Sequence, residues 1–140
     1  MSTPVVIDAS AAVELLARTD RGAALRALLP VAAVPWVPDG LFDAEVGSVL
    51  RRWDLRSVLT PEQGTATALR MRTWQVRRAS VRVLHDDAWA LRHNVTYTDG
   101  LYVALAQRIG AALLTDDHKL AYAPTLPIEV LHLGDSPGPR

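Results

Sequence analysis

The sequence predicts a single-domain α/β protein with a parallel sheet of about four to five strands flanked by helices. The chain has 140 residues, the common size of one domain. Short apolar runs alternate along it with helical segments, which is typical of a parallel sheet covered on both faces. We expect one domain over residues 1–133 and a disordered tail over 134–140, where Gly and Pro are frequent.

The first two elements are a buried strand and a helix. Residues 4–8 form a continuous apolar run that ends in a carboxylate, and this run predicts a buried strand. Ser10 is a good N-cap for a helix over 11–18. If Ser10 caps that helix, Asp8 has no structural role and becomes a candidate for function.

Residues 21–53 predict two helices with an apolar segment between them. The first helix is short and covers residues 21–29. The segment 31–37 is apolar but contains Pro35, so we expect a strand there to be short or at an edge of the sheet. Asp39 is the predicted cap of a helix that runs to about Trp53.

A strong helix start lies at residues 60–63, where Thr, Pro, Glu and Gln stand in the order of a capping box with proline in the first turn. We expect this helix to run to about Arg77. Residues 81–84 predict a weak strand or connector, and residues 86–92 predict a short helix.

The last part of the chain predicts helix, strand, helical turn and strand. Thr98 is the predicted cap of a helix that ends at Gly110. Residues 111–115 are the clearest second strand. A helical turn to about Ala123 then precedes a final strand at 127–133.

Composition excludes several classes of protein. There is no cysteine, so a disulfide scaffold, an iron–sulfur cluster, Cys-ligated zinc and cysteine catalysis are ruled out. Hydrophobic residues make up 49% and charged residues 21%, the balance of a folded chain. No apolar run approaches the roughly 18 residues of a membrane span, and the N-terminus lacks the features of a secretory signal. We therefore expect a cytoplasmic protein without membrane contact.

The net charge is zero, but basic residues are concentrated in one segment. Residues 51–82 contain eight arginines and only two acids. Arginine binds phosphate in a bidentate manner, so this segregation indicates a surface for nucleic acid, although a solvated helix face explains any single arginine equally well. The candidate RNA contacts are Arg70, Arg72, Arg77 and Arg78.

Acids follow the two clearest strands. Asp8 ends the first, and Asp116 and Asp117 follow the strand at 111–115. Ligands of parallel sheets bind outside the carboxyl ends of the strands, although each acid would also serve as a helix cap. Because side chains alternate along an extended segment, we expect Asp117 on the side of Thr115 and Asp116 on the other.

Two helical acids complete the set. Glu45 falls on the apolar arc of its helix, between Leu41 and Val49, where a carboxylate is costly unless it is paired or binds a metal. Pairing with Arg52, or a place at the edge of the buried face, is the alternative. Asp99 begins another apolar stripe, and a favourable interaction with the helix dipole would also explain it.

Together these carboxylates indicate a metal site with oxygen ligands. No pair of histidines has the spacing of metal ligands. Clustered carboxylates suit Mg²⁺ or Mn²⁺. Such sites support phosphoryl chemistry, in which metal ions stabilise the attacking and leaving oxygens.

Four segments resemble the motifs of the PIN-domain family, and their order and the chain length resemble specifically the VapC-like toxin ribonucleases of type II toxin–antitoxin pairs. The resemblance covers the whole chain up to the tail, so residues 1–133 resemble a PIN-like nuclease domain. The four segments are residues 5–10 (VVIDAS), 45–52 (EVGSVLRR), 98–106 (TDGLYVALA) and 114–120 (LTDDHKL).

This resemblance implies a Rossmann-like sheet, Mg²⁺-dependent cleavage of RNA (with Mn²⁺ as a second candidate metal), homodimerisation and inhibition by a cognate antitoxin. The sequence departs from the family pattern at Gly100, where Ala is usual, and at Asp116, an extra acid that we expect in an outer or exposed position. The acids that the resemblance makes both catalytic and metal-binding are Asp8, Glu45, Asp99 and Asp117, with supporting hydroxyls on Ser10 and Thr115.

The sequence therefore predicts a metal-dependent endoribonuclease whose basic segment holds the RNA backbone. One alternative is a phosphohydrolase that uses Asp8 as a covalent nucleophile. That chemistry usually has a second acid two residues further on, where this chain has Ser10. The other alternative is a non-catalytic PIN-like binding module, against which the presence of all four acids speaks.

Overall fold

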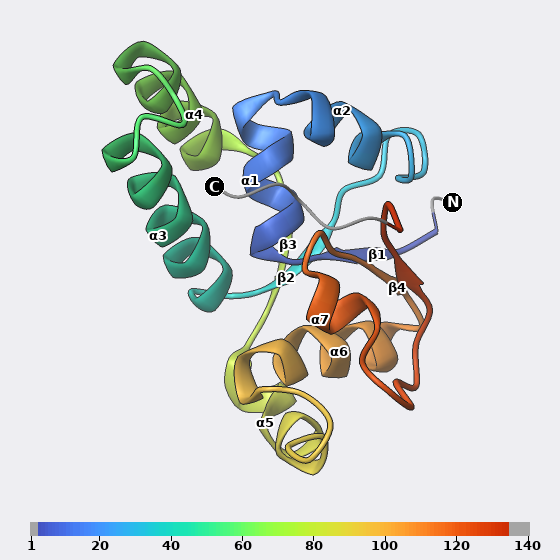
Figure 1. Cartoon of the computed structure of the whole chain (residues 1–140). Helices are drawn as coiled ribbons and strands as arrows, with labels where there is room; N and C mark the ends of the chain where they lie inside the picture. The colour runs from blue at the N-terminus through green and yellow to red at the C-terminus, as the bar shows by residue number, and fades with distance from the viewer. Residues whose placement is uncertain (1–2, 135–140) are drawn as a thin grey trace.

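A five-stranded parallel sheet lies at the centre of the computed structural model, which describes residues 3–134 (Figure 1). Its strands stand in the order β3-β2-β1-β4-β5, so the predicted α/β class is confirmed. The strands are β1 (Val5–Ile7), β2 (Trp36–Pro38), β3 (Arg77–Ala79), β4 (Ala112–Leu114) and β5 (Val130–Leu131). The helices of the described part are α1 (Ala9–Ala17), α2 (Asp20–Arg26), α3 (Leu41–Leu55), α4 (Pro61–Thr73), α5 (Val81–Ala90), α6 (Tyr97–Ile109) and α7 (His118–Ala121).

β1 is the centre of the sheet and of the core. It pairs with β2 on one side and with β4 on the other, and residues 5–7 are at most 1% exposed. A strand buried on both faces needs apolar side chains at successive positions, which accounts for the continuous apolar run. The register places Ile7 opposite Leu114, so the next residues, Asp8 and Thr115, reach the carboxyl edge of the sheet side by side.

Helices cover both faces of the sheet (Figure 1). α1 and α2 lie on one side, and α6 lies on the other, where it packs against β1, β2 and β4 with α5 outside it. α3 and α4 pack against each other and against α1, and they form an arm that extends away from the sheet. The carboxyl edge of the central strands therefore lies between the α3–α4 arm and the α5–α6 layer.

The predicted capping box at the start of α4 is confirmed. The Thr60 hydroxyl accepts a hydrogen bond from the Gln63 N–H at 3.1 Å, and the Gln63 side chain accepts one from the Thr60 N–H at 2.8 Å. The helix ends at Thr73 rather than at the predicted Arg77. Residues 77–79 leave the helix because they pair with β2 and form the strand β3.

Asp8, and not Ser10, caps α1, which corrects the prediction. The helix begins at Ala9, and the Asp8 carboxylate accepts a hydrogen bond from the Ala11 N–H at 3.1 Å. Asp8 is the one residue between the end of β1 at Ile7 and the start of α1 at Ala9, so it is the residue in the capping position. Asp8 therefore has a structural role in addition to any functional one.

Two other predicted caps are also wrong. α3 begins after Gly40, and the Asp39 carboxylate is instead bonded to Arg78. α6 begins after Thr96 rather than at Thr98, and the Thr96 hydroxyl accepts a hydrogen bond from the Asp99 N–H at 3.2 Å. Thr96 has the extended backbone and the capping hydroxyl that start α6, whereas Gly40 starts α3 with a positive φ of 79° and no side-chain capping bond.

The segment after β3 is helical where the sequence predicted a weak strand. α5 begins at Val81, and the Ser80 hydroxyl accepts from the Arg82 N–H at 3.2 Å. The helix buries Leu84 and Ala88, which stand four residues apart. The spacing of the buried positions is thus helical rather than alternating.

β2 is as short as predicted, but it does not lie at an edge. Residues 77–79, where the sequence predicted only the end of a helix at about Arg77, supply the outer strand beside it. The last strand covers only Val130–Leu131 within the predicted 127–133. Of the predicted tail over 134–140, residues 135–140 lie outside the described part of the chain. No helix among residues 3–134 is long and apolar enough to cross a membrane.

Gly22 allows α1 and α2 to cross closely. A Cβ atom at this position would lie 2.2 Å from the carbonyl oxygen of Glu14, far inside contact distance. The Gly22 N–H also donates to the hydroxyl of Thr19, the residue that caps α2, at 2.9 Å. Only glycine fits here unless the two helices move apart.

We expect Gly22→Ala to lower the free energy of unfolding by about 1–3 kcal/mol, because the helices must separate to admit the methyl group. Gly47→Ala in α3 is the matched control. Its Cβ would meet only the flexible end of Met71 at 3.8 Å, and alanine favours a helix over glycine by up to about 1 kcal/mol. Urea unfolding followed by circular dichroism measures both, and a Gly22 variant as stable as the wild type would contradict the close crossing.

Candidate active site

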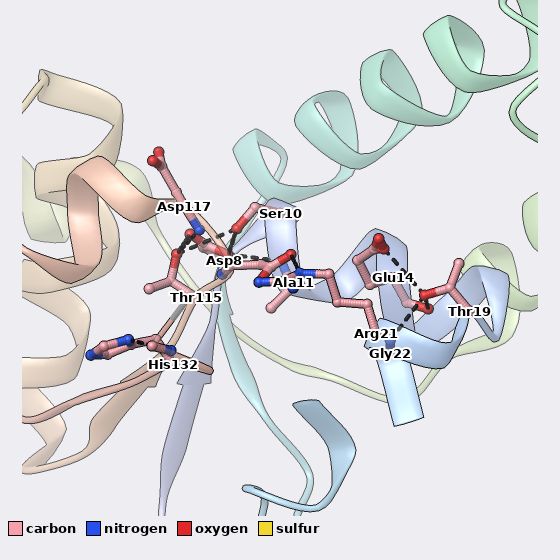
Figure 2. A network of polar contacts seen from close by, with 12 residues as sticks. Asp8, Ser10, Ala11, Glu14, Thr19, Arg21, Gly22, Thr115, Asp117 and His132 are labelled. Carbon is pink, nitrogen blue, oxygen red and sulfur yellow. Dashed lines mark hydrogen bonds and ion pairs between the residues drawn. The ribbon is translucent and has the colours of Figure 1, made fainter. Parts of the chain in front are cut away.

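Asp8 is the buried centre of a polar network at the carboxyl edge of the sheet (Figure 2). Its side chain is held by hydrogen bonds on both oxygens. Oδ1 accepts from the Ser10 hydroxyl at 2.7 Å and from the Ala11 N–H, and Oδ2 accepts from the Thr115 hydroxyl. The residue is only 5% exposed. Its orientation is therefore fixed by groups from both α1 and the end of β4.

The same two hydroxyls also hold the segment that follows β4. The Ser10 hydroxyl accepts from the Asp116 N–H at 2.9 Å, and the Thr115 hydroxyl accepts from the Asp117 N–H at 3.0 Å. The hydroxyl oxygens of Ser10 and Thr115 lie 3.3 Å from each other. Because these bonds join the ends of two neighbouring strands, they set the position of the Asp116-Asp117 pair relative to Asp8.

Asp116 and Asp117 have different surroundings. Asp116 accepts a hydrogen bond from Arg21 Nε of α2 at 2.7 Å, and its side chain is 5% exposed. Asp117 caps α7 by accepting from the Lys119 N–H at 2.9 Å, and it lines a surface cavity together with Asp99. The acid doublet is thus divided between a buried ion pair and the open edge of the sheet.

Glu45 reaches the site from α3, and Tyr102 holds it there. The Tyr102 hydroxyl donates to Glu45 Oε1 at 2.7 Å. Tyr102 is 1% exposed and lies one turn after Asp99 on α6, so it joins the α3 acid to the helix that carries another acid. Pairing of Glu45 with Arg52 is not what the structure shows.

Sequence reasoning missed the parts played by Tyr102 and Arg21. For Tyr102 a signal existed, since its spacing of three residues from Asp99 places both on one face of a helix. For Arg21 no local signal exists, because its partner Asp116 lies 95 residues away.

Burial raises the pKa of Asp8 to about 7. The hydrogen bonds from Ser10, Thr115 and the Ala11 N–H favour the ionised carboxylate, but they offset only part of the cost of removing this charge from water. The negative charge of Asp99 adds to the effect. Asp8 therefore gains and loses its proton near neutral pH.

Asp99 interacts electrostatically with each of the other three acids. Burial, followed by the charge of Asp117, raises the pKa of Asp99. Burial also raises the pKa of Glu45, where the charge of Asp99 adds to it and the Tyr102 hydrogen bond opposes it. The four acids predicted from the sequence are thus brought into one electrostatic group, although they come from four separate segments.

The donors at this edge suit Mg²⁺ or Mn²⁺ in kind. Four carboxylates and two hydroxyls supply only oxygen, the ligand that these hard cations take. The carboxylates repel one another, and a cation between them would stabilise their ionised forms. Among residues 3–134, no three acidic or histidine side chains stand close enough to hold one ion at once. A shared ion would therefore require the carboxylates to draw together.

The candidate RNA-binding arginines are spread over the molecule. Arg70 Nε donates to the Leu16 carbonyl oxygen at 2.7 Å, at the end of α1 that is far from the carboxyl edge. Arg78 is bonded to Asp39 at 2.9 Å and to Asp43 at 2.5 Å. These contacts engage both guanidinium groups in local structure.

The other two arginines of the set are exposed. Arg77 lies over the ring of Trp36, with 5.9 Å between its guanidinium carbon and the ring centroid, and Arg72 projects from α4. None of the four lines the cavity that Asp99 and Asp117 share. The structure therefore does not gather these arginines around the acids.

Comparisons with known proteins agree with this geometry. A family model described as PIN domain matches residues 5–126. Ribonuclease VapC1 of Mycobacterium tuberculosis is 43% identical over 128 residues, which cover 89% of this chain and 94% of that protein.

Solved structures resemble the chain in fold. VapBC2 from Rickettsia felis, bound to a DNA fragment from its promoter, has a TM-score of 0.60 at 13% identity and covers 93% of this chain and 98% of its own. A toxin–antitoxin complex from Klebsiella pneumoniae has a TM-score of 0.58 at 14% identity and covers 93% and 96%. At these identities the likeness is one of fold alone.

Asp8 should make the chelated, metal-free protein less stable as pH rises. Its folded pKa of about 7 lies above the ordinary value of 3.8, so between these values the folded state binds more protons than the unfolded state. The free energy of unfolding should then fall by up to about 1.4 kcal/mol per pH unit in this window and level off above it. Urea unfolding from pH 4.5 to 8 measures the slope.

Asp8→Asn is the comparison that isolates this carboxyl. The variant should lose most of the slope and keep a smaller one of the same sign from Glu45 and Asp99, whose pKa values are also raised. Parallel stability curves for variant and wild type would show that Asp8 does not titrate in this range.

Proposed function

This chain belongs to the PIN domain family, and we propose that it is a metal-dependent endoribonuclease that acts as the toxin of a toxin–antitoxin pair. One observation carries the proposal. Asp8, Glu45, Asp99 and Asp117 come from four separate segments, and burial and mutual repulsion raise the pKa of three of them. Two of these acids also cap helices, but burial and repulsion within the cluster cost stability, so its use is best explained by a cation and a phosphate substrate.

In this proposal the four acids hold Mg²⁺ or Mn²⁺. When bound, the cation lowers the pKa of a coordinated water and neutralises charge on the scissile phosphate. Asp8 keeps its orientation because Ser10 and Thr115 bind both of its oxygens, and Oδ2, which accepts from the Thr115 hydroxyl, retains a further lone pair. Asp117 is fixed through the Lys119 N–H in the same way.

Glu45 and Tyr102 act as a pair in this scheme. The Tyr102 hydroxyl donates a hydrogen bond to Oε1 of Glu45, so in this proposal Oε2 is the oxygen available to the cation. The bond also fixes α3 to α6 at the point where their acids approach. Tyr102 is therefore a positioning residue, which acts through Glu45 rather than on the substrate.

We also propose that the basic segment contacts RNA backbone, with unequal parts for its members. Arg72 and Arg77 are exposed and free to reach phosphates. Arg70 and Arg78 mainly stabilise local structure through Leu16 and through two aspartates. Exposed guanidinium groups bind phosphate without displacing an existing partner, which favours the first pair.

The partners proposed are an RNA substrate, a cognate antitoxin protein and a second copy of the chain. The relative VapC1 is named a ribonuclease, and the neighbour from Klebsiella pneumoniae is a toxin–antitoxin complex. We place the protein in the cytoplasm, where such a substrate is found. Light scattering of the purified chain decides between monomer and dimer.

A phosphohydrolase with Asp8 as nucleophile is a poorer fit. The side chain of Asp8 is buried, and Ser10 stands two residues further on, where such an enzyme usually has its second acid. A non-catalytic module would have no reason to keep four mutually repelling acids.

The test of the proposal is direct. Purified chain, stripped with chelator, should cleave RNA only after Mg²⁺ or Mn²⁺ is added, and millimolar Mn²⁺ should raise its melting temperature through linkage. Mapping the cleaved ends then identifies the substrate. Cleavage that persists in chelator, or no cleavage with either metal, would overturn the metal-dependent mechanism.

Glu45→Gln should reduce cleavage by about 100-fold or more, because it keeps the side chain's shape but removes a charge from the cation site. Asp43→Asn, on the same helix, should leave cleavage near wild type. Its carboxylate pairs with Arg78 at a half-exposed position, so the cost is at most about 1 kcal/mol of stability. Equal losses of activity in the two variants would mean that the face of α3 toward the site is not the one bearing Glu45.

Asp117→Asn and Asp116→Asn test the division of the acid doublet. Asp117→Asn should lose cleavage and weaken Mn²⁺ binding measured by calorimetry, while its stability stays close to wild type. Asp116→Asn should keep most activity but lose about 1–3 kcal/mol of stability, since Arg21 would face a neutral side chain in a buried pair. An inactive Asp116 variant beside an active Asp117 variant would reverse the assignment.

A further inference from the structure

A cavity of about 620 Å³ opens beside the acids, on the α5–α6 side of the carboxyl edge. Asp99 and Asp117 form part of its wall, and the connection between α5 and α6 (residues 92–96) and α7 form much of the rest. Small-molecule sites typically have about 300–1,000 Å³. The space next to the acids therefore suits a group of about the size of a nucleotide.

The lining of this cavity also includes basic residues. Arg92 and Lys119 line it, and both are exposed. Within residues 3–134, neither of them forms an ion pair with a carboxylate. Two cations without a carboxylate partner thus line the same cavity as two of the acids, and their charges are available to an anionic ligand.

Both cations are placed by local contacts. Arg92 Nη1 donates to the Trp89 carbonyl oxygen at 3.1 Å, and its guanidinium lies over the exposed Trp89 ring at 4.9 Å, which leaves its other N–H donors available. The backbone N–H of Lys119 donates to the Asp117 carboxylate, so the Lys119 side chain begins beside that acid. Arg92 is therefore held against the end of α5, and Lys119 is held beside Asp117.

The loop that carries Arg92 is also tied down. The Asn94 side chain donates to the Thr125 hydroxyl at 2.9 Å, across to the segment that precedes β5. Thr96 at the end of the loop caps α6, the helix that bears Asp99. The basic wall is thus anchored to the elements that carry the acids.

We infer that this cavity is the subsite for the RNA strand next to the bond that is cleaved, with Arg92 and Lys119 binding the phosphates that flank it. The inference rests on the proposed ribonuclease function and deepens it. An RNA strand carries one phosphate per nucleotide. One phosphate can lie at the cation that the acids bind, while its neighbours lie at the basic groups beside them. An acidic peptide segment would instead bring carboxylates against Asp99 and Asp117.

With this subsite, the RNA strand next to the cleaved bond lies on a different side of the molecule from the basic segment. The arginines of α4 and β3 do not line this cavity. α4 belongs to the arm on the other side of the carboxyl edge (Figure 1). Arg92 and Lys119 therefore contact the RNA phosphates close to the scissile bond. Arg72 and Arg77 contact the RNA backbone further from that bond.

The test measures binding of a fluorescein-labelled single-stranded RNA by anisotropy in chelator, where no cleavage occurs, over a series of salt concentrations. Arg92→Gln and Lys119→Gln should each raise Kd about fivefold at 0.1 M salt and reduce the slope of log K against log salt by about 0.7, the value for one phosphate contact on a single strand. Lys119→Arg keeps the charge and should keep the slope.

Arg108→Gln is the matched control. Arg108 lies in the last turn of α6, is exposed, and faces Asp87 at 3.8 Å, so its loss removes one positive charge far from the cavity. It should change neither Kd nor slope. In cleavage assays with metal, Arg92→Gln and Lys119→Gln should raise KM and leave kcat near wild type, whereas Glu45→Gln lowers kcat.

The outcomes separate this inference from the function on which it rests. If the wild type cleaves RNA and the two variants bind it as tightly and with the same slope, the subsite is wrong while the ribonuclease stands, and the two cations serve another partner. If Arg108→Gln weakens binding as much as they do, the effect is one of overall charge and the subsite is again wrong. A wild type that neither binds nor cleaves RNA would overturn both.

Discussion

The hydrogen bonds that join Asp8 to Ser10 and Thr115 are the contacts on which the site depends. The bond to Ser10 is local, whereas the bond to Thr115 forms because β1 and β4 are neighbours in parallel register, which brings residues 107 positions apart to the same edge. The same hydroxyls accept from the backbone of the Asp116-Asp117 segment. A single network thus orients a buried carboxylate, joins two strands and positions the next acid.

This arrangement has an energetic cost. Desolvation raises the pKa of Asp8, Glu45 and Asp99, and their charges oppose one another. The surrounding structure offsets the cost with a close-packed core around β1 and with polar partners for each buried acid, and no buried side-chain polar atom of the described residues lacks a partner. A functional cluster of buried acids lowers stability at the site, and it persists because the polar groups around it have hydrogen-bond partners.

Charge is divided across the molecule in a way that net charge conceals. Asp116 pairs with Arg21 and Asp43 with Arg78, while Asp99 and Asp117 line an open cavity together with Arg92 and Lys119, which form no ion pair within the described residues. An abundance of arginine in one stretch of sequence therefore does not locate the phosphate-binding surface. Pairing within the fold decides which basic groups remain free.

The sequence alone determined the α/β class, the central apolar strand and the capping box at Thr60, because periodicity and capping are local properties. It also predicted the four acids from motif spacing, and their role as a site stays a prediction. It did not determine the edge strand at residues 77–79, whose polar sequence becomes a strand only by pairing with β2. Nor did it determine that Asp8 caps α1, that Tyr102 holds Glu45 or that Arg21 neutralises Asp116. Pairings of strands and of charged side chains across long stretches of sequence depend on which segments meet in space, and only the tertiary structure decides that.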